Sequence, residues 1–161
     1  MNDPRTQNGA PKSIAFILIL IIVAFDQLTK HWALGSLNDG KTIDIFWTLR
    51  FNLVFNSGMA FSQGQGVGRV IGLLAVCVVI GLLISLRKTM SLQTTIGTGL
   101  LIGGAIGNIF DRLFRGDGWM RGAVVDFIDL QWFPVFNIAD SAVTIGAACL
   151  IFGAFNARVR S

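Results

Sequence analysis

The feature that most constrains this chain is its set of long apolar stretches. Residues 70–86 and 91–110 contain no charged side chain. A helix rises about 1.5 Å per residue, so about 20 residues span the bilayer's hydrocarbon core, which is about 30 Å thick. Two further stretches reach that length although charged residues interrupt them. The sequence predicts one membrane domain, residues 1–161, with four transmembrane helices at about 14–34, 67–86, 91–112 and 136–156.

Composition and the distribution of positive charge agree with this interpretation. Hydrophobic residues make up 53% of the chain and charged residues 14%, which is more apolar than a soluble domain. With an even number of spans, both termini share a side with the short connection between the second and third spans. Basic residues are dense on this side, so the positive-inside rule makes it cytoplasmic. They are Arg5, Lys12, Arg87, Lys88, Arg158 and Arg160.

The first apolar stretch has the basic flank of a signal peptide, because Arg5 and Lys12 precede it. No small-x-small cleavage site follows its apolar core closely, and the charged continuation at 26–30 is unlike one. We therefore expect the first span to be retained.

An alternating pattern lies between the first two spans, on the outer side. Apolar residues from Ile43 to Phe55 alternate with mostly polar neighbours, and the pattern ends at Asn56. A period of two is typical of an amphipathic strand, here one strand or a bent pair of strands. The glycine-rich segment 64–68 then provides a flexible return into the second span.

The third predicted span carries a face of small residues. Gly99, Gly103 and Gly107 recur every fourth residue, so they lie on one side of a helix. Such a face allows another helix to approach closely. Gly104 lies beside it.

Eight polar residues share the outer boundary of the membrane in this topology. Several have a purely structural explanation: Asp26 and Lys30 can form an i, i+4 ion pair, Asn108 can join helices, and Arg112 can reach the interface as an anchor. Their common depth favours a functional site instead. They are Asp26, Lys30, Asn56, Asn108, Arg112, Asp126, Asn137 and Asp140.

Two of these residues also fit a helix start. Asn137 and Asp140 are three residues apart, as an N-cap and its acidic partner are in a capping box. The helix dipole favours a carboxylate at this position. This explanation accounts for Asp140 alone and leaves Asp126 and Asp26 unexplained.

Three carboxylates, Asp126, Asp129 and Asp140, lie among aromatic and aliphatic residues with no Lys, Arg or His between them. If Asp126 and Asp140 converge, both cannot ionise together, so one keeps a proton while the other activates water. That is how an aspartic peptidase divides the work. We interpret Asp129 as a bystander, a solvated loop residue.

Other chemistries fit less well. His31 is the only histidine and there is no HExxH motif, so we expect no metal site. Ser57, with His31 or Lys30 as its base, lacks the flanking glycine that an intramembrane serine protease uses. Phosphate-binding motifs and basic clusters interleaved with aromatics are missing, so we expect no cofactor and no nucleic-acid partner.

Five motifs, spread over all four spans and in conserved order, closely resemble those of bacterial lipoprotein signal peptidase, the type II signal peptidase. They are DQLTK at 26–30, NSGMAF at 56–61, GGAIGNIFDR at 103–112, VVDF at 124–127 and FNIAD at 136–140. The segment between Arg112 and Asp126 is longer than the family pattern, by roughly the insert RGDGWMRG.

The resemblance implies a four-helix membrane aspartic endopeptidase with a small extracytoplasmic β-sheet, in the bacterial cytoplasmic (inner) membrane. Its substrate would be a diacylglyceryl-modified prolipoprotein, cut just before the lipid-bearing Cys near the extracytoplasmic face. Globomycin would inhibit it. Asp126 and Asp140 would be the catalytic pair. The supporting and substrate-positioning residues would be Asp26, Lys30, Asn56, Gly104, Asn108, Arg112 and Asn137.

Two other functions remain open. A small transporter or channel subunit could use Asp26, Lys30 and Asp140 as an ion or proton path, but its charges should then continue towards the cytoplasmic face. The inner halves of the last three spans hold no ionisable residue. The second is an assembly or scaffold protein, for which the glycine face would suffice and the aspartates would be dispensable.

Overall fold

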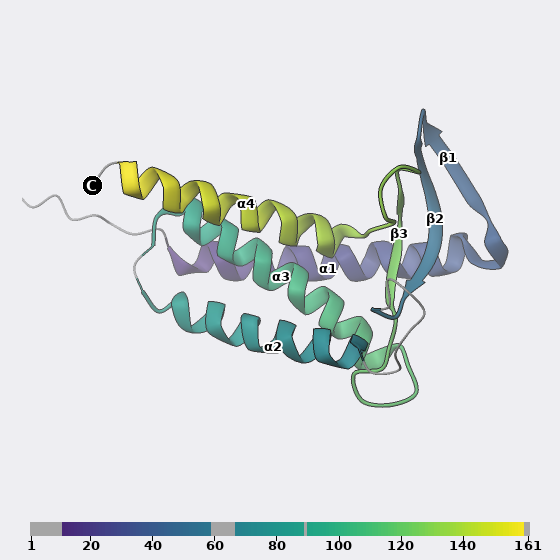
Figure 1. Cartoon of the computed structure of the whole chain (residues 1–161), viewed down its shortest axis with the longest axis horizontal. Helices are drawn as coiled ribbons and strands as arrows, with labels where there is room; N and C mark the ends of the chain where they lie inside the picture. The colour runs from purple at the N-terminus through teal and green to yellow at the C-terminus, as the bar shows by residue number, and fades with distance from the viewer. Residues whose placement is uncertain (1–10, 59–66, 89, 160–161) are drawn as a thin grey trace, which may run out of the picture.

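The structure, a computed structural model, describes residues 11–58, 67–88 and 90–159. Its helices run side by side, and a small sheet lies across one end of them (Figure 1). This confirms the predicted class, a mainly helical membrane protein with a small sheet. Within the described residues the elements are α1 (Lys12–Ser36), a 3₁₀ turn (Asn38–Gly40), β1 (Thr42–Phe46), β2 (Leu49–Asn56), α2 (Val67–Ser85), α3 (Leu92–Phe114), β3 (Val124–Asp129) and α4 (Ile138–Val159).

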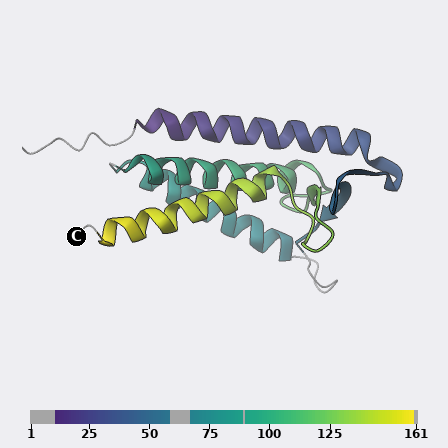
Figure 2. The same cartoon turned by 90° about the horizontal axis from the view of Figure 1, so that it is seen from above.

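Three of the described helices, α1, α2 and α4, are long and apolar enough to cross a membrane. They correspond to the predicted first, second and fourth spans. The predicted third span forms α3, which has 23 residues but does not reach the same apolar character. It packs against the other three helices, and Figure 2 shows it between α1 and α4. A central helix contacts little lipid, so it can carry polar residues.

The glycine face of α3 packs against α1, as the predicted close approach requires. A Cβ added at Gly99 would lie 3.0 Å from the Cα of Ala15, and one at Gly103 would lie 3.0 Å from the Cβ of Ile22. Gly104 faces α4 instead, where an added Cβ would lie 2.8 Å from the Cγ2 of Val143. These small residues let α3 approach α1 and α4 closely.

The alternating segment forms the antiparallel pair β1 and β2, the second of the two predicted alternatives. Trp47, at the turn between them, has a positive φ of 53°. β2 ends at Asn56 as predicted, and it also pairs antiparallel with β3 in the order β1-β2-β3. Gly64 and Gly66, in the predicted flexible return, lie outside the described residues.

The third strand was not predicted. β3 is buried along nearly all of its length, so its sequence does not alternate. Phe127 of β3 packs with Ala33 and Leu37 at the end of α1, and its ring also meets Trp32. These contacts fix β3 across the ends of the helices.

The insert at 115–122 follows α3 and turns back onto it. The backbone N–H of Gly122 donates to the carbonyl of Arg112 at 2.9 Å. The chain then enters β3 at Val124. The longer segment therefore leaves the motifs on both sides of it in place.

The start of α1 and the end of α4 lie at the end of the bundle away from the sheet (Figure 1). The connection between α2 and α3 lies there too, since Lys12 Nζ donates to the carbonyl of Arg87 at 3.0 Å. This is the clustering of basic residues that the predicted topology requires. Arg5 and Arg160 lie outside the described residues.

Candidate active site

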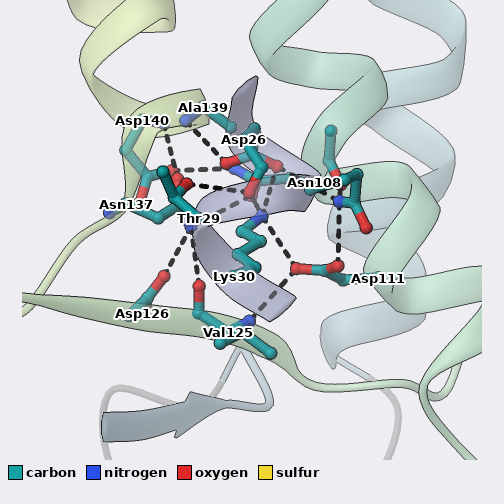
Figure 3. Close-up of polar contacts among 12 residues, drawn as sticks. Asp26, Thr29, Lys30, Asn108, Asp111, Val125, Asp126, Asn137, Ala139 and Asp140 are labelled. Carbon is teal, nitrogen blue, oxygen red and sulfur yellow. Dashed lines mark hydrogen bonds and ion pairs between the residues drawn. The ribbon is translucent and has the colours of Figure 1, made fainter. Parts of the chain in front are cut away.

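Asp126 and Asp140, from β3 and the first turn of α4, meet at one residue, Asn137. The side-chain amide of Asn137 donates to Asp126 Oδ1 at 2.6 Å, and its backbone N–H donates to Asp140 Oδ2 at 3.2 Å. Figure 3 shows the two carboxyl groups on either side of Asn137. The structure thus brings together the two predicted carboxylates from separate segments.

The capping box at the start of α4 is also present. Asp140 N–H donates to Asn137 Oδ1 at 2.8 Å, while Asp140 Oδ2 accepts from the backbone of Asn137. These reciprocal bonds satisfy backbone groups at the helix start and fix the carboxyl of Asp140 there. The capping-box explanation is therefore right, and the capping box also fixes the position of the Asp140 carboxyl group in the site.

Asn108 of α3 links the carboxyl group of Asp140 to the buried side chain of Lys30. Its amide donates to Asp140 Oδ1 at 2.7 Å, and its Oδ1 accepts from Lys30 Nζ at 3.0 Å and from Asn137 at 3.2 Å. Asn108 is the interhelical bridge that its sequence position suggested. One oxygen of Asp140 therefore accepts from a residue of α3, and the other accepts from the residue that precedes α4.

The environment of Asp126 favours its neutral form. The side chain is 1% exposed, and burial is the main cause that raises its pKa to about 6; the charge of Asp140 acts in the same direction. Hydrogen bonds from Asn56, at 3.0 Å to Oδ2, and from Asn137 oppose the shift. Asn56 is itself held, because its Oδ1 accepts from Gly58 N–H at 2.9 Å.

This shift predicts a pH-dependent stability. Because the folded-state pKa of Asp126 is raised from 3.8 to about 6, its stabilisation is present below pH 3.8 and is lost as the pH rises through about 6. The loss amounts to up to about 3 kcal/mol. In melting experiments in detergent, Asp126→Asn should gain stability relative to wild type between about pH 4 and 7. Parallel curves for the two proteins over that range would contradict the raised pKa.

A buried ion cluster lies beneath the pair. Lys30 is 0% exposed, and its Nζ contacts three acceptors: Asp26 Oδ2 and Asp111 Oδ2, both at 2.8 Å, and Asn108 Oδ1 at 3.0 Å. The three hydrogens of the ammonium group thus each have an acceptor (Figure 3). The expected i, i+4 pair of Asp26 and Lys30 is confirmed, but it is part of a larger cluster.

Asp26 connects the cluster to α4. Its Oδ1 accepts from the backbone N–H of Ala139 at 2.9 Å, in the first turn of α4. A Cβ added at Gly107 would lie 2.6 Å from Asp26 Oδ2, so only glycine admits the carboxylate here. Asp26 and Lys30 therefore hold the helices in register beneath the site.

Three residues of this cluster were missed as site residues: Gln27, Asp111 and Arg115. Asp111 accepts from Arg115 Nε at 2.7 Å, from Gln27 Nε2 at 3.1 Å and from Val125 N–H at 3.1 Å. The last bond fixes β3 next to Asp126. One signal was in the sequence, because Asp111 follows Asn108 by three residues and so shares its helix face.

The interpretation of Arg112 as an interface anchor is wrong. Its side chain is 7% exposed, because the insert folds back over this turn of α3. Its Nη1 atom is buried and has no hydrogen-bond partner among the described residues. A buried guanidinium N–H group without an acceptor is energetically costly.

The interpretation of Asp129 as a solvated loop residue is also wrong. Asp129 ends β3, is 4% exposed and accepts from Arg50 Nε at 2.8 Å in the opposite position of β2. Burial acts to raise its pKa, but hydrogen bonds from Arg50, the backbone of Gln131 and Asn52 outweigh it and lower the pKa. Three residues apart on a strand, Asp126 and Asp129 point to opposite faces.

A cavity of about 640 Å³ opens beside the pair. Asp140 and Asn56 contribute polar groups to it, and Ser141 and Thr144 continue along α4. Most of the remaining wall is apolar and comes from 130–136, the segment that joins β3 to α4. The cavity can therefore hold an apolar chain next to the carboxyl group of Asp140. In the described part of the chain, no three His, Cys, Asp or Glu residues cluster to hold a metal ion.

The chain is similar to known proteins over most of its length. The family model of signal peptidase (SPase) II matches residues 18–156. The lipoprotein signal peptidase of Rhodococcus jostii (strain RHA1) is 40% identical over 159 residues, which cover 93% of this chain and 80% of that protein. The lipoprotein signal peptidase of Mycobacterium leprae (strain Br4923) is 40% identical over 144 residues, which cover 88% of this chain and 72% of that protein.

The fold also matches solved structures. A bacterial membrane enzyme solved by the in meso method at 1.9 Å resolution is 27% identical and superposes with a TM-score of 0.79. The match covers 92% of this chain and 96% of that one. The four helices and the sheet thus recur together in a known membrane enzyme.

Proposed function

Because the chain belongs to the signal peptidase II family, we propose that this membrane peptidase is an aspartic endopeptidase with Asp126 and Asp140 as its catalytic pair. Its substrate is a diacylglyceryl-modified prolipoprotein, and it cuts just before the lipid-bearing Cys. The observation that carries the proposal is the convergence of both carboxyl groups on Asn137. Asn137 orients both acids, Asp126 through its side-chain amide and Asp140 through its backbone N–H.

The two carboxyl groups have different surroundings, and we assign their roles from this difference. Asp140 lines the cavity, so as a carboxylate it takes a proton from the attacking water. Asp126 is buried and its pKa is raised to about 6, so it retains a proton once substrate excludes water, and donates a hydrogen bond to the scissile carbonyl. Asp140 then returns its proton to the leaving amine.

The supporting residues act through this pair. Asn56, Asn108 and Asn137 direct four hydrogen bonds onto its oxygens, which fixes the orientation of both carboxyl groups. Asp26, Lys30 and Gly104 hold α1, α3 and α4 together beneath it. The Nη1 atom of Arg112, which has no hydrogen-bond partner among the described residues, binds a carbonyl of the substrate.

The position of the site suits a substrate that is itself a membrane helix. The pair lies at the end of the bundle that carries the sheet, away from the basic ends of the helices. By the positive-inside rule this end is extracytoplasmic and both termini are cytoplasmic. The signal peptide enters sideways from the membrane lipid, and its apolar residues occupy the cavity beside Asp140.

The alternative, an ion or proton path, is less well supported. The buried charged residues that the structure describes all gather at the sheet end of the bundle, and in the inner halves of α2, α3 and α4 the one charged side chain is Arg158, in the last turn of α4. A path across the membrane needs polar groups along its length. Flux measurements in liposomes test this alternative, and substantial flux would favour it.

The proposed function is tested with purified protein and a lipid-modified precursor peptide. We expect a single cut before the modified Cys by mass spectrometry, inhibition by globomycin, and undiminished activity with a chelator. The same peptide without its diacylglyceryl group is the control and should remain intact. No cleavage of the modified peptide, or activity that a chelator removes and zinc restores, would contradict the proposal.

Asp129→Asn should largely spare this cleavage. Asp129 points away from the pair, the substitution keeps the size of its side chain, and its partner Arg50 is partly exposed to water. We expect kcat/KM within about threefold of wild type. A loss as large as that of the Asp126 and Asp140 variants would place Asp129 in the catalytic machinery.

A further inference from the structure

The loop at 115–122 is tied to the helical turn that carries Arg112. Its far end returns there, since Gly122 N–H donates to the Arg112 carbonyl at 2.9 Å. A Cβ added at Gly122 would lie 3.1 Å from both the Cα and the carbonyl oxygen of Arg112. At its near end, Arg115 contacts Asp111 at 2.7 Å. The loop is therefore fixed at both ends around one turn of α3.

Between these ends the loop buries one side chain, Met120. Met120 is 1% exposed, whereas the neighbouring Trp119 is 65% exposed. The backbone of Met120 has a φ of 56°, in the left-handed region that a non-glycine residue occupies at a cost of about 1 kcal/mol or more. The loop thus adopts a strained conformation that turns Met120 inwards.

Met120 and Arg112 share the space that Gly72 of α2 leaves open. A Cβ added at Gly72 would lie 2.8 Å from Met120 Cε and 3.1 Å from Arg112 Cδ. The thioether and the aliphatic part of the arginine therefore lie side by side against α2. At the end of that aliphatic part stands Nη1, buried and without a partner among the described residues.

We propose that Met120 is a positioning residue: together with Gly72 it holds the Arg112 side chain so that its free Nη1 faces the substrate. This rests on the proposed function, because it concerns how Arg112 meets the substrate of that reaction. A long arginine stem has several rotamers, and packing on one side removes the alternatives before substrate binds. The insert thereby contributes to the site without touching the substrate.

The test uses four variants and measures kcat/KM for the lipid-modified precursor peptide. Met120→Ala opens a gap beside the arginine stem, and we expect a loss of about tenfold. Met120→Leu refills most of the volume and should recover most of the activity. Gly72→Ala adds a methyl group on α2 that would displace Met120 and the arginine stem, so it should also reduce kcat/KM. Trp119→Ala, in the same loop but exposed, is the matched control and should stay within about twofold of wild type.

A double-mutant cycle separates positioning from general stability. In an Arg112→Gln background, measured under single-turnover conditions, Met120→Ala should change cleavage by less than about twofold, because no arginine remains to be positioned. An equal tenfold loss in both backgrounds, or wild-type activity in Met120→Ala, would overturn the inference. If the wild-type protein itself does not cleave the peptide, the proposed function fails and this inference falls with it.

Discussion

Asp126→Asn and Asp140→Asn should each reduce prolipoprotein cleavage by about 10³-fold or more while leaving the protein inserted and folded. Each substitution keeps the size of the side chain and removes a group that carries a proton in the reaction. Without Asp140 no carboxylate in the cavity takes the proton of water. Without Asp126 the scissile carbonyl loses its donor acid.

The measurement is the cleavage rate of the lipid-modified precursor peptide, read by mass spectrometry, alongside thermal melting in detergent. Asp129→Asn is the matched control, since Asp129 is an aspartate of the same strand as Asp126 and points to the other face. Full activity in either variant of the pair would end the assignment. Equal losses in all three variants with unchanged melting would place Asp129 in the catalytic machinery as well, whereas losses accompanied by a lower melting temperature would show damage to the fold.

Lys30→Met should destabilise the protein by about 3–5 kcal/mol. Lys30 is fully buried between Asp26 and Asp111, at 2.8 Å from each. Removing the ammonium group leaves these carboxylates without their shared cation in a site where water cannot replace it. Because Asp26 also accepts from Ala139 N–H at the start of α4, the loss should loosen the contact between α1 and α4.

Thermal melting in detergent measures this effect, and the midpoint should fall by on the order of 10 °C. Lys41→Met, at an exposed lysine before β1, is the control and should change the midpoint little. Adding Asp26→Asn to Lys30→Met should restore part of the stability, because it removes one of the uncompensated charges. A Lys30→Met protein as stable as wild type would show that the cluster does not hold the helices together.

Much of the architecture could be predicted from the sequence because it depends on local pattern. The length of the apolar stretches is matched to the bilayer, so α1, α2 and α4 were recognisable. The glycine spacing of α3 identified a face for close helix packing, and the alternation up to Asn56 identified β1 and β2. β3 was missed because a strand buried on both faces does not alternate.

The candidate site divides in the same way. Asp126 and Asp140 stood out in the sequence because a carboxylate in an apolar segment needs an explanation, and the structure places both on Asn137. The environment of Asp129 was misjudged, and the burial of Arg112 was not foreseen. Each depends on a segment distant in sequence or on an insert, namely β2 for Asp129 and the loop at 115–122 for Arg112.

The sequence by itself determined a membrane-embedded bundle with paired acids at one boundary, since hydrophobicity and periodicity are properties of neighbouring residues. Only the tertiary structure decided which groups neutralise one another. Lys30 and Asn108, which are 78 residues apart, meet because glycines let α1 and α3 approach closely. The charge that each buried group carries follows from such contacts, because in a low-dielectric interior a partner within hydrogen-bonding distance outweighs everything further along the chain.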